Sequence, residues 1–198
     1  MKKLILASAS SARARLLDAA GVEFRIEPAE IDEAEFKRTG RASRWTPQDC
    51  ALALAEAKAQ SVSRRYPGAL IIGADQILAC DGKWFDKPVG IIAARRQLQA
   101  LRGRTHLLAT AACVVRDGER VWHHVSSPEL MMRRFSDEFL DDYLAAEGET
   151  VLGSVGGYRL EARGVQLFEH ISGDHFAILG LPLIELLGFL RETGNVLS

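Results

Sequence analysis

The chain has 198 residues, with 25 lysines and arginines against 26 aspartates and glutamates, so its formal net charge is −1. Apolar residues make up 47% and charged residues 26%, a balance that is typical of folded globular proteins and excludes dominant disorder. The near-neutral charge argues against a dedicated nucleic-acid binder, whose basic face raises the charge of the whole domain. We find no repeat or linker, so residues 1–198 are expected to form one domain.

The cysteines and the apolar segments indicate the cellular compartment of the protein. The 3 cysteines are widely spaced and include no CxxC pair, which argues against a disulfide framework and a zinc site and predicts reduced thiols. The apolar stretch near the N-terminus is too short for a signal peptide. The most apolar segment, 176–190, contains Pro182 and Glu185 and is too short to span a membrane. We therefore expect a soluble cytoplasmic protein with no membrane partner.

Strands and helices alternate in the first part of the chain. Gly21 is placed to end a helix as a left-handed cap, and Thr46 followed by Pro47 is typical of a helix start. The expected elements are a strand at 2–7, a helix ending at Gly21, a strand at 22–26, a mostly irregular loop at 27–45, and a helix from Thr46 to about Tyr66.

Hairpins are inserted in the second part of the chain. Asp81-Gly82 and Asp117-Gly118 are turn signals between apolar runs. The expected elements are strands at 69–80 and 83–85, a helix at 90–101, strands at 106–115 and 120–134, a helix from Ser136, a strand-like stretch from the glycines at 153–157 to Ile171, and a helix at 181–190. Helices alternating with hairpins favour a mixed α/β sheet over a purely parallel one.

The first candidate site lies at the junction between the first strand and the first helix. Such a junction exposes backbone N–H groups at the positive end of the helix dipole, which suits a phosphate. Hydroxyls of Ser8 and Ser10 can donate to phosphate oxygens, and Arg13 can grip one with its planar guanidinium. A serine N-cap followed by a surface arginine fits the same residues.

The second candidate is Asp75, an acid inside the apolar run 69–80. A buried carboxylate costs several kcal/mol unless it is paired, hydrogen-bonded or bound to a metal. Gly73 nearby permits another group to approach the backbone closely. A general base, a metal ligand and a structural salt bridge all remain consistent with this pattern.

Three further charged residues have less specific surroundings. Lys58 lies in an Ala- and Leu-rich helical stretch, and Lys87 precedes Pro88; each alone is typical of a solvated lysine. Together with Arg13 they would supply the cations that a triphosphate requires. Glu33 is a second candidate carboxylate, or part of an acidic loop. Oxygen ligands and phosphates favour Mg²⁺ or Mn²⁺ over zinc.

No GxxxxGK[ST], GxGxxG or GxSxG motif occurs, which removes the main support for a P-loop NTPase, a Rossmann enzyme and a serine hydrolase. Seven segments instead form a pattern in a fixed order, namely LILASASSARARLL at 4–17, IDE at 31–33, LALAEAKA at 52–59, GADQ at 73–76, DKP at 86–88, LRGRTH at 101–106 and GVQLFEHISGDHFAILGLPL at 164–183. With these segments the chain resembles the Maf family of nucleoside triphosphate pyrophosphatases over nearly its whole length.

The resemblance implies a fold, an activity and residue roles. The implied fold is an elongated mixed α/β sheet with flanking helices and a central cleft, similar to inosine-triphosphate pyrophosphatases. The implied reaction cleaves a nucleoside triphosphate into the monophosphate and pyrophosphate with a divalent cation. The implied roles are phosphate binding for Ser8, Arg13, Lys58 and Lys87, proton acceptance or metal binding for Asp75, and a place near the metal for Glu33.

Departures from the family pattern bear on the substrate. The opening motif commonly reads S-P-R-R, whereas Ala12 stands here in place of an arginine or, in one branch, an aromatic residue. The branch that prefers dTTP and UTP has GADT and a late glutamine, whereas this chain has Gln76 and Glu161. Both resemble the branch associated with 7-methyl-GTP, so Gln76 and Glu161 are predicted to bind substrate. A dTTP/UTP pyrophosphatase is the alternative.

Other function classes remain to be weighed. A nucleotide-binding regulator of cell division would bind without releasing pyrophosphate, and another metal-dependent phosphohydrolase would release orthophosphate. A purely structural module would not need an acid inside a strand. The expected partner is a small nucleotide and no nucleic acid; members of the family often form homodimers, but no pattern in the chain identifies an interface.

Overall fold

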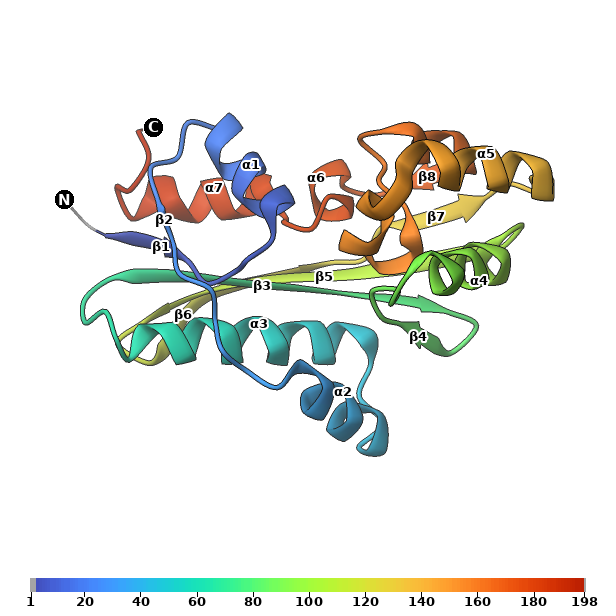
Figure 1. Ribbon diagram of the computed structural model, residues 1–198. Helices are drawn as coiled ribbons and strands as arrows, with labels where there is room; N and C mark the ends of the chain where they lie inside the picture. Colours follow the sequence, from blue (N-terminus) through green and yellow to red (C-terminus); the bar gives the residue numbers. More distant parts are fainter. Residues whose placement is uncertain (1–2, 198) are drawn as a thin grey trace. The chain divides into compact units, whose positions relative to one another are not determined.

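The computed structural model describes residues 3–197, which divide into two compact units (Figure 1). Unit 1 comprises residues 3–76, 110–126 and 174–197, and unit 2 comprises residues 77–109 and 127–173. Strands β3 (Leu70–Cys80) and β5 (Thr105–Arg116) each pass from one unit into the other. The described strands form a mixed sheet of eight strands in the order β2-β1-β3-β5-β7-β8, with β4 paired to β3 and β6 to β5. The expected mixed α/β class is thus confirmed.

The sheet of unit 1 is built on two short apolar runs. Strand β1 (Leu4–Leu6) lies parallel to β2 (Arg25–Ile26) on one side and to β3 on the other, where it pairs with Leu70, Ile71 and Ile72. The second half of β5 pairs antiparallel with β6 (Glu119–Ser126). Continuous apolar sequence is characteristic of parallel strands that are covered on both faces.

Helices cover both faces of this sheet. Figure 1 shows α1 (Ser11–Ala19) and α7 (Leu183–Glu192) over one face and α3 (Pro47–Ser63) over the other. Gly21 ends the α1 segment with a φ of 69°, and Thr46 caps α3 in a reciprocal arrangement with Asp49, as the sequence predicts. The core beneath α1 and α7 consists of buried aliphatic side chains, chiefly Leu4, Leu6, Leu17, Leu70, Ile72, Leu186 and Leu190.

The predicted loop at 27–45 is wrong, because residues Glu33–Ala42 form helix α2. The side chain of Asp32 caps this helix by accepting a hydrogen bond from the Glu35 N–H, and Glu35 pairs with Arg38 one turn later. Charged side chains fill the exposed face, so the helix has few apolar positions to show a period. The helix contacts α3, and Gly40 is buried in it: a Cβ there would lie 3.0 Å from the ring of Trp45, in the segment between the two helices, and 3.5 Å from the Cys50 Sγ of α3.

Unit 2 contains a second set of strands and helices. They are β4 (Lys83–Phe85), α4 (Ile91–Leu101), β7 (Glu129–Met132), α5 (Asp137–Glu147), β8 (Phe168–Ser172) and three 3-10 segments, at Gly148–Gly153, Val155–Gly157 and Arg163–Leu167. The strand expected at 120–134 is divided into β6 and β7, since the segment at Ser127-Pro128 interrupts it. Proline cannot donate to a sheet ladder, which explains the break.

The strand-like stretch expected from residue 153 to Ile171 is wrong except for β8. Gly148, Gly156 and Gly157 have positive φ values of 56°, 79° and 73°, which turn the backbone repeatedly and prevent an extended run. A short helix that the sequence analysis did not anticipate, α6 (His175–Ile178), follows β8. Among residues 3–197, no helix combines the length and the apolar composition that crossing a bilayer requires.

Candidate functional site

The centre of the candidate site is an ion pair between α3 and β3. The Nζ of Lys58 lies 2.5 Å from the Oδ1 of Asp75, and the side chains are only 9% and 8% exposed. Gly73 makes this approach possible, because a Cβ at that position would lie 2.0 Å from the Ala55 carbonyl oxygen of α3. The sequence therefore places a glycine where the helix backbone touches the strand, two residues before the acid.

Glu33 joins this pair from the first turn of α2. Its Oε1 lies 2.7 Å from the Lys58 Nζ, and its side chain is 48% exposed. Lys58 therefore lies within reach of one buried and one half-exposed carboxylate. The interpretation of Lys58 as a solvated lysine is wrong, and Glu33 belongs to a helix rather than to an acidic loop.

The strand–helix junction holds Arg13 in a buried position. Ser10 caps α1 by accepting a hydrogen bond from the Arg13 N–H at 3.4 Å. The Arg13 guanidinium donates from Nη1 to the Ser8 Oγ at 3.1 Å and from Nε to the Gly180 carbonyl at 2.8 Å. The serine cap exists, but the interpretation of Arg13 as a surface residue is wrong, since it is 8% exposed.

Electrostatics connect Arg13 with the carboxylates. Burial lowers the pKa of the Arg13 guanidinium, while the negative charges of Asp75 and Glu33 act in the opposite direction. An arginine side chain stays protonated in proteins even when its pKa falls. Within unit 1, the cluster thus contains two cations, Arg13 and Lys58, and two carboxylates.

Gln76, the residue after Asp75, points its amide nitrogen at the scaffold. Its Nε2 lies 2.8 Å from the Thr110 Oγ1, 3.0 Å from the Ala177 carbonyl and 3.2 Å from the Ile178 carbonyl. The nitrogen of this amide therefore binds protein acceptors in unit 1. Contact of the Gln76 side chain with a substrate stays a prediction.

The other two predicted substrate-binding residues belong to unit 2. Lys87 is exposed in the segment between β4 and α4, and Glu161 is exposed beside Arg159, whose Nε lies 3.5 Å from the Glu161 Oε1. The segment that carries Glu161 starts at the buried Tyr158, whose hydroxyl lies 2.8 Å from the His106 Nε2. The structure thus brings Ser8, Arg13, Glu33, Lys58, Asp75 and Gln76 into one unit, and the participation of Lys87 and Glu161 stays a prediction.

The sequence matches proteins that are already known. The family described as Maf-like protein matches residues 3–193. The chain belongs to the Maf-like family. A protein of Granulibacter bethesdensis named nucleoside triphosphate pyrophosphatase is 53% identical over 190 residues, covering 96% of each chain. A protein of Rhizobium etli named 7-methyl-GTP pyrophosphatase is 47% identical over 194 residues, covering 98% of each.

A third Maf-like relative, from Paramagnetospirillum magneticum, is also named nucleoside triphosphate pyrophosphatase. It is 53% identical over 192 residues, which cover 97% of this chain and 99% of the relative. The resemblance predicted from the seven sequence segments is therefore confirmed.

The donor set of this Maf-like chain fits a magnesium ion held partly by substrate. In the described part of the chain, no group of three or more His, Cys, Asp and Glu side chains is placed to hold a metal ion. Mg²⁺ commonly takes one or two carboxylates and completes its shell with phosphate oxygens and water. Asp75 and Glu33, whose oxygens converge on one lysine nitrogen, are the two carboxylates that would hold such an ion.

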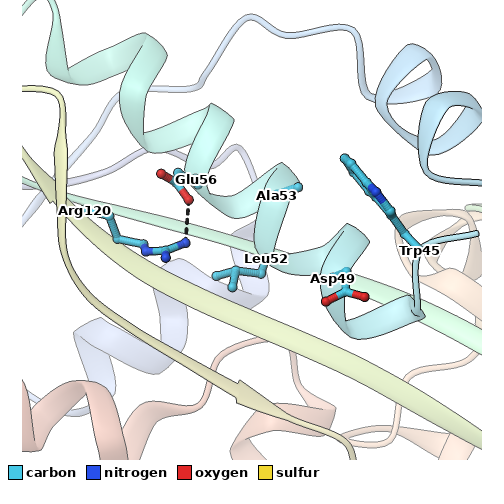
Figure 2. A pocket seen from close by; sticks show the side chains of 6 residues that line it. All are labelled: Trp45, Asp49, Leu52, Ala53, Glu56 and Arg120. Atoms are coloured by element: carbon cyan, nitrogen blue, oxygen red, sulfur yellow. Dashed lines mark hydrogen bonds and ion pairs between the residues drawn. The ribbon is translucent and has the colours of Figure 1, made fainter. Parts of the chain in front are cut away.

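A separate pocket lies on the outer side of α3 and contains none of the predicted residues (Figure 2). Its volume is about 420 Å³, and Trp45, Asp49, Leu52, Ala53, Glu56 and Arg120 line it. Figure 2 shows the Arg120 guanidinium directed at Glu56, 2.6 Å away. The Arg120 charge is therefore neutralised by Glu56, and the pocket contains none of the candidate phosphate-binding residues.

Two groups of unit 1 were not identified from the sequence. The Gly180 carbonyl accepts a hydrogen bond from the Arg13 Nε, and Thr110 is buried in β5, where its hydroxyl donates to the Ala177 carbonyl at 2.9 Å. A glycine and a threonine are ordinary within apolar segments such as these. Nothing in the sequence pattern pointed to either role.

Proposed function

We propose that the chain is a nucleoside triphosphate pyrophosphatase, which removes a modified or non-standard nucleotide from the pool. The observation that carries the proposal is the position of Lys58 between Asp75 and Glu33, in the same unit as the buried Arg13. An acid in a strand, with cations beside it, suits attack of water on a phosphate chain. The printed names of relatives that match almost the whole chain support the same reaction.

The cations bind and orient the triphosphate. The Ser8 hydroxyl and the Arg13 guanidinium, held together at 3.1 Å, donate to phosphate oxygens. An ammonium has three N–H donors, so Lys58 can keep its two carboxylates and still donate to a phosphate. Lys87 adds a further cation in the proposed complex. These charges stabilise the negative charge that develops on the leaving group.

Asp75 prepares the attacking water. Its carboxylate orients the water and accepts its proton, while a new bond forms between the water oxygen and the α-phosphorus. The α–β phosphoanhydride bond breaks, and pyrophosphate leaves with the bonding electron pair. Asp75 and Glu33 would also hold the divalent cation, Mg²⁺ or Mn²⁺. When bound, this cation would neutralise part of the negative charge of the phosphates.

The proposed substrate is a 7-methyl-GTP-like purine nucleotide. Gln76 and Glu161 occupy the two positions at which the branches of the family differ, and the Glu161 carboxylate can accept hydrogen bonds from a base's N–H edge. In the proposed base pocket, Ala12 would leave more room than an arginine or an aromatic side chain. The relative from Rhizobium etli is named 7-methyl-GTP pyrophosphatase, which supports this branch.

The compartment and the partners are part of the same proposal. The cysteines Cys50, Cys80 and Cys113 are free and buried, which accords with a reducing cytoplasm. We propose a small nucleotide as the ligand, with neither nucleic acid nor membrane as a partner, and a homodimer as in other members of the family.

A triphosphate panel tests the proposal. Initial rates with 7-methyl-GTP, GTP, dTTP and UTP are measured in Mg²⁺ and in Mn²⁺, with separate detection of pyrophosphate and orthophosphate. We expect pyrophosphate, with 7-methyl-GTP the preferred substrate. A large preference for dTTP would select the dTTP/UTP alternative, orthophosphate would indicate another phosphohydrolase, and nucleotide binding without turnover would favour the cell-division regulator.

A further inference from the structure

The C-terminal end of α6 accepts hydrogen bonds from side chains of three different elements. The Ala177 and Ile178 carbonyls accept from Gln76 of β3, and the Gly180 carbonyl accepts from Arg13 of α1. Carbonyls at a helix end lack partners within the helix, so they are available to such donors. At the other end, Asp174 fixes α6 by accepting from the Phe176 and Ala177 N–H groups.

Thr110 is the third donor and the most completely buried. It is 0% exposed in β5, donates from Oγ1 to the Ala177 carbonyl at 2.9 Å and accepts from the Gln76 Nε2 at 2.8 Å. One hydroxyl thus fixes both the α6 carbonyl and the glutamine that holds the next carbonyl. Every residue of this network lies in unit 1.

The backbone connects this network to Arg13 within a few residues. Gly180, which follows α6 by two residues, has a φ of 109°, a conformation that side chains rarely adopt. Its carbonyl is 2.8 Å from the Arg13 Nε, and a Cβ at this position would lie 3.5 Å from the same nitrogen. The position of the guanidinium therefore depends on where the end of α6 is held.

We infer that Thr110 is a positioning residue for phosphate binding: by fixing the end of α6 it holds the Gly180 carbonyl that orients the Arg13 guanidinium. The inference rests on the proposed function, in which Arg13 binds the phosphate chain. Thr110 itself contacts no reacting atom. It acts through Arg13, so its effect on activity disappears when Arg13 is absent.

Two substitutions at Thr110 separate its hydroxyl from its volume. Thr110→Val keeps the shape and removes the donor; we expect kcat/KM to fall about tenfold, less than the roughly 100-fold that a full 1 Å displacement of a binding group costs. Thr110→Ser keeps the hydroxyl and should stay within about twofold of the parent. Gln76 retains both α6 carbonyls in either variant, so the fold should persist.

A matched control is Thr193→Val. The Thr193 hydroxyl also donates to a main-chain carbonyl of unit 1, that of Phe189, but at the end of α7. We expect this variant to lose a similar amount of stability and to keep kcat/KM within about twofold. Equal losses of activity in Thr110→Val and Thr193→Val would contradict the positioning role.

The decisive experiment is a double-mutant cycle with Arg13. Rates are measured with 7-methyl-GTP or dTTP, whichever is cleaved faster, for Thr110→Val, Arg13→Ala and the double variant. We expect the double variant to be no slower than Arg13→Ala within about twofold, whereas independent effects would multiply. Arg13→Lys, which keeps the charge but not the planar fork, replaces Arg13→Ala if the latter does not fold.

The outcomes separate this inference from the proposed function. If Arg13→Ala retains full activity, the phosphate-binding role of Arg13 is wrong; if its activity falls but the effects multiply, the role of Thr110 is wrong. The same cycle is measured on the dissociation constant of inorganic tripolyphosphate with Mg²⁺. If the effects of the two substitutions on tripolyphosphate binding are not additive but the protein cleaves no nucleotide, the positioning role of Thr110 is supported and the pyrophosphatase activity is rejected.

Discussion

The ammonium of Lys58 lies 2.5 Å from the Oδ1 of Asp75, and both side chains are almost completely removed from solvent. Two opposite charges in such a position stabilise each other only as a pair. Loss of Lys58 leaves the buried Asp75 without its direct partner, which costs about 3 kcal/mol, whereas Lys58 without Asp75 still has Glu33 at 2.7 Å. This relationship makes the ion pair both a structural and a chemical requirement.

Lys58→Met should therefore lower the free energy of unfolding by about 3 kcal/mol, because Asp75 loses its buried partner. The double variant Lys58→Met/Asp75→Asn should be more stable than Lys58→Met, since it buries no unpaired carboxylate. Urea unfolding at pH 7 measures both. Arg95→Met, which breaks the exposed pair with Asp141, should lower the stability far less than Lys58→Met and is the control.

Gly73→Ala should separate α3 from β3. The added Cβ would meet the Ala55 carbonyl at 2.0 Å, so the helix must move, and we expect a loss of about 1–3 kcal/mol together with most of the activity. Gly188→Ala is the matched control, since a Cβ there meets nothing within 4 Å and α7 gains a better helix former. Thermal unfolding should give shifts of opposite sign; a neutral Gly73→Ala would contradict the close approach.

Stability should fall between about pH 6.5 and pH 4 because of His106. Burial lowers the pKa of this histidine to about 4, against an ordinary 6.5, so the unfolded chain takes up its proton first as the pH falls. The neutral His106 ring contributes fully to the free energy of unfolding above pH 6.5. This contribution is lost as the pH falls toward 4, a change of about 3 kcal/mol. In His106→Gln the fall should be shallower by that amount, measured by urea unfolding at several pH values.

A matched substitution checks that this effect belongs to the buried ring. His123 is exposed on β6, so His123→Gln should keep the parent's dependence of stability on pH. If His123→Gln and His106→Gln flatten the profile equally, burial of His106 does not cause the dependence.

Glu33→Gln should raise the Mg²⁺ concentration for half-maximal rate about tenfold, because one of the two proposed carboxylate ligands is lost. Its half-exposed side chain makes a large loss of stability unexpected. Glu35→Gln on the same helix alters an exposed carboxylate that contacts Arg38 and should leave the Mg²⁺ dependence unchanged. Titration of the rate with MgCl₂ distinguishes them, and an unaltered midpoint in Glu33→Gln would remove Glu33 from the metal site.

The sequence predicts those elements whose causes are local. The cap at Thr46, the turn at Asp81-Gly82 and the apolar runs of β1 and β3 each depend on residues within a few positions, and all are present. Helix α2 escaped prediction because it contains few apolar residues and its buried residue, Gly40, lies against Cys50 of α3, a neighbour that depends on how the two helices pack. The glycine-rich stretch after α5 escaped because positive φ values, not side chains, determine its path.

The candidate site shows the same division. The residue types of Arg13, Lys58 and Asp75 are visible in the sequence, and their chemistry suggested a phosphate site. That Lys58 joins Asp75 to Glu33 depends on α2 and α3 packing together, so it was not accessible before the structure. The Gly180 carbonyl that accepts from the Arg13 Nε has no sequence signature, since every residue carries a carbonyl.

The proposed reaction depends above all on Asp75, which prepares water for attack at the α-phosphorus. The most direct measurement compares the parent and Asp75→Asn for pyrophosphate release from 7-methyl-GTP, with circular dichroism as the check on folding. Asparagine keeps the shape and can no longer accept the proton, so we expect a folded variant whose turnover falls at least about 100-fold. A folded Asp75→Asn variant that releases pyrophosphate at the parent's rate would contradict the account.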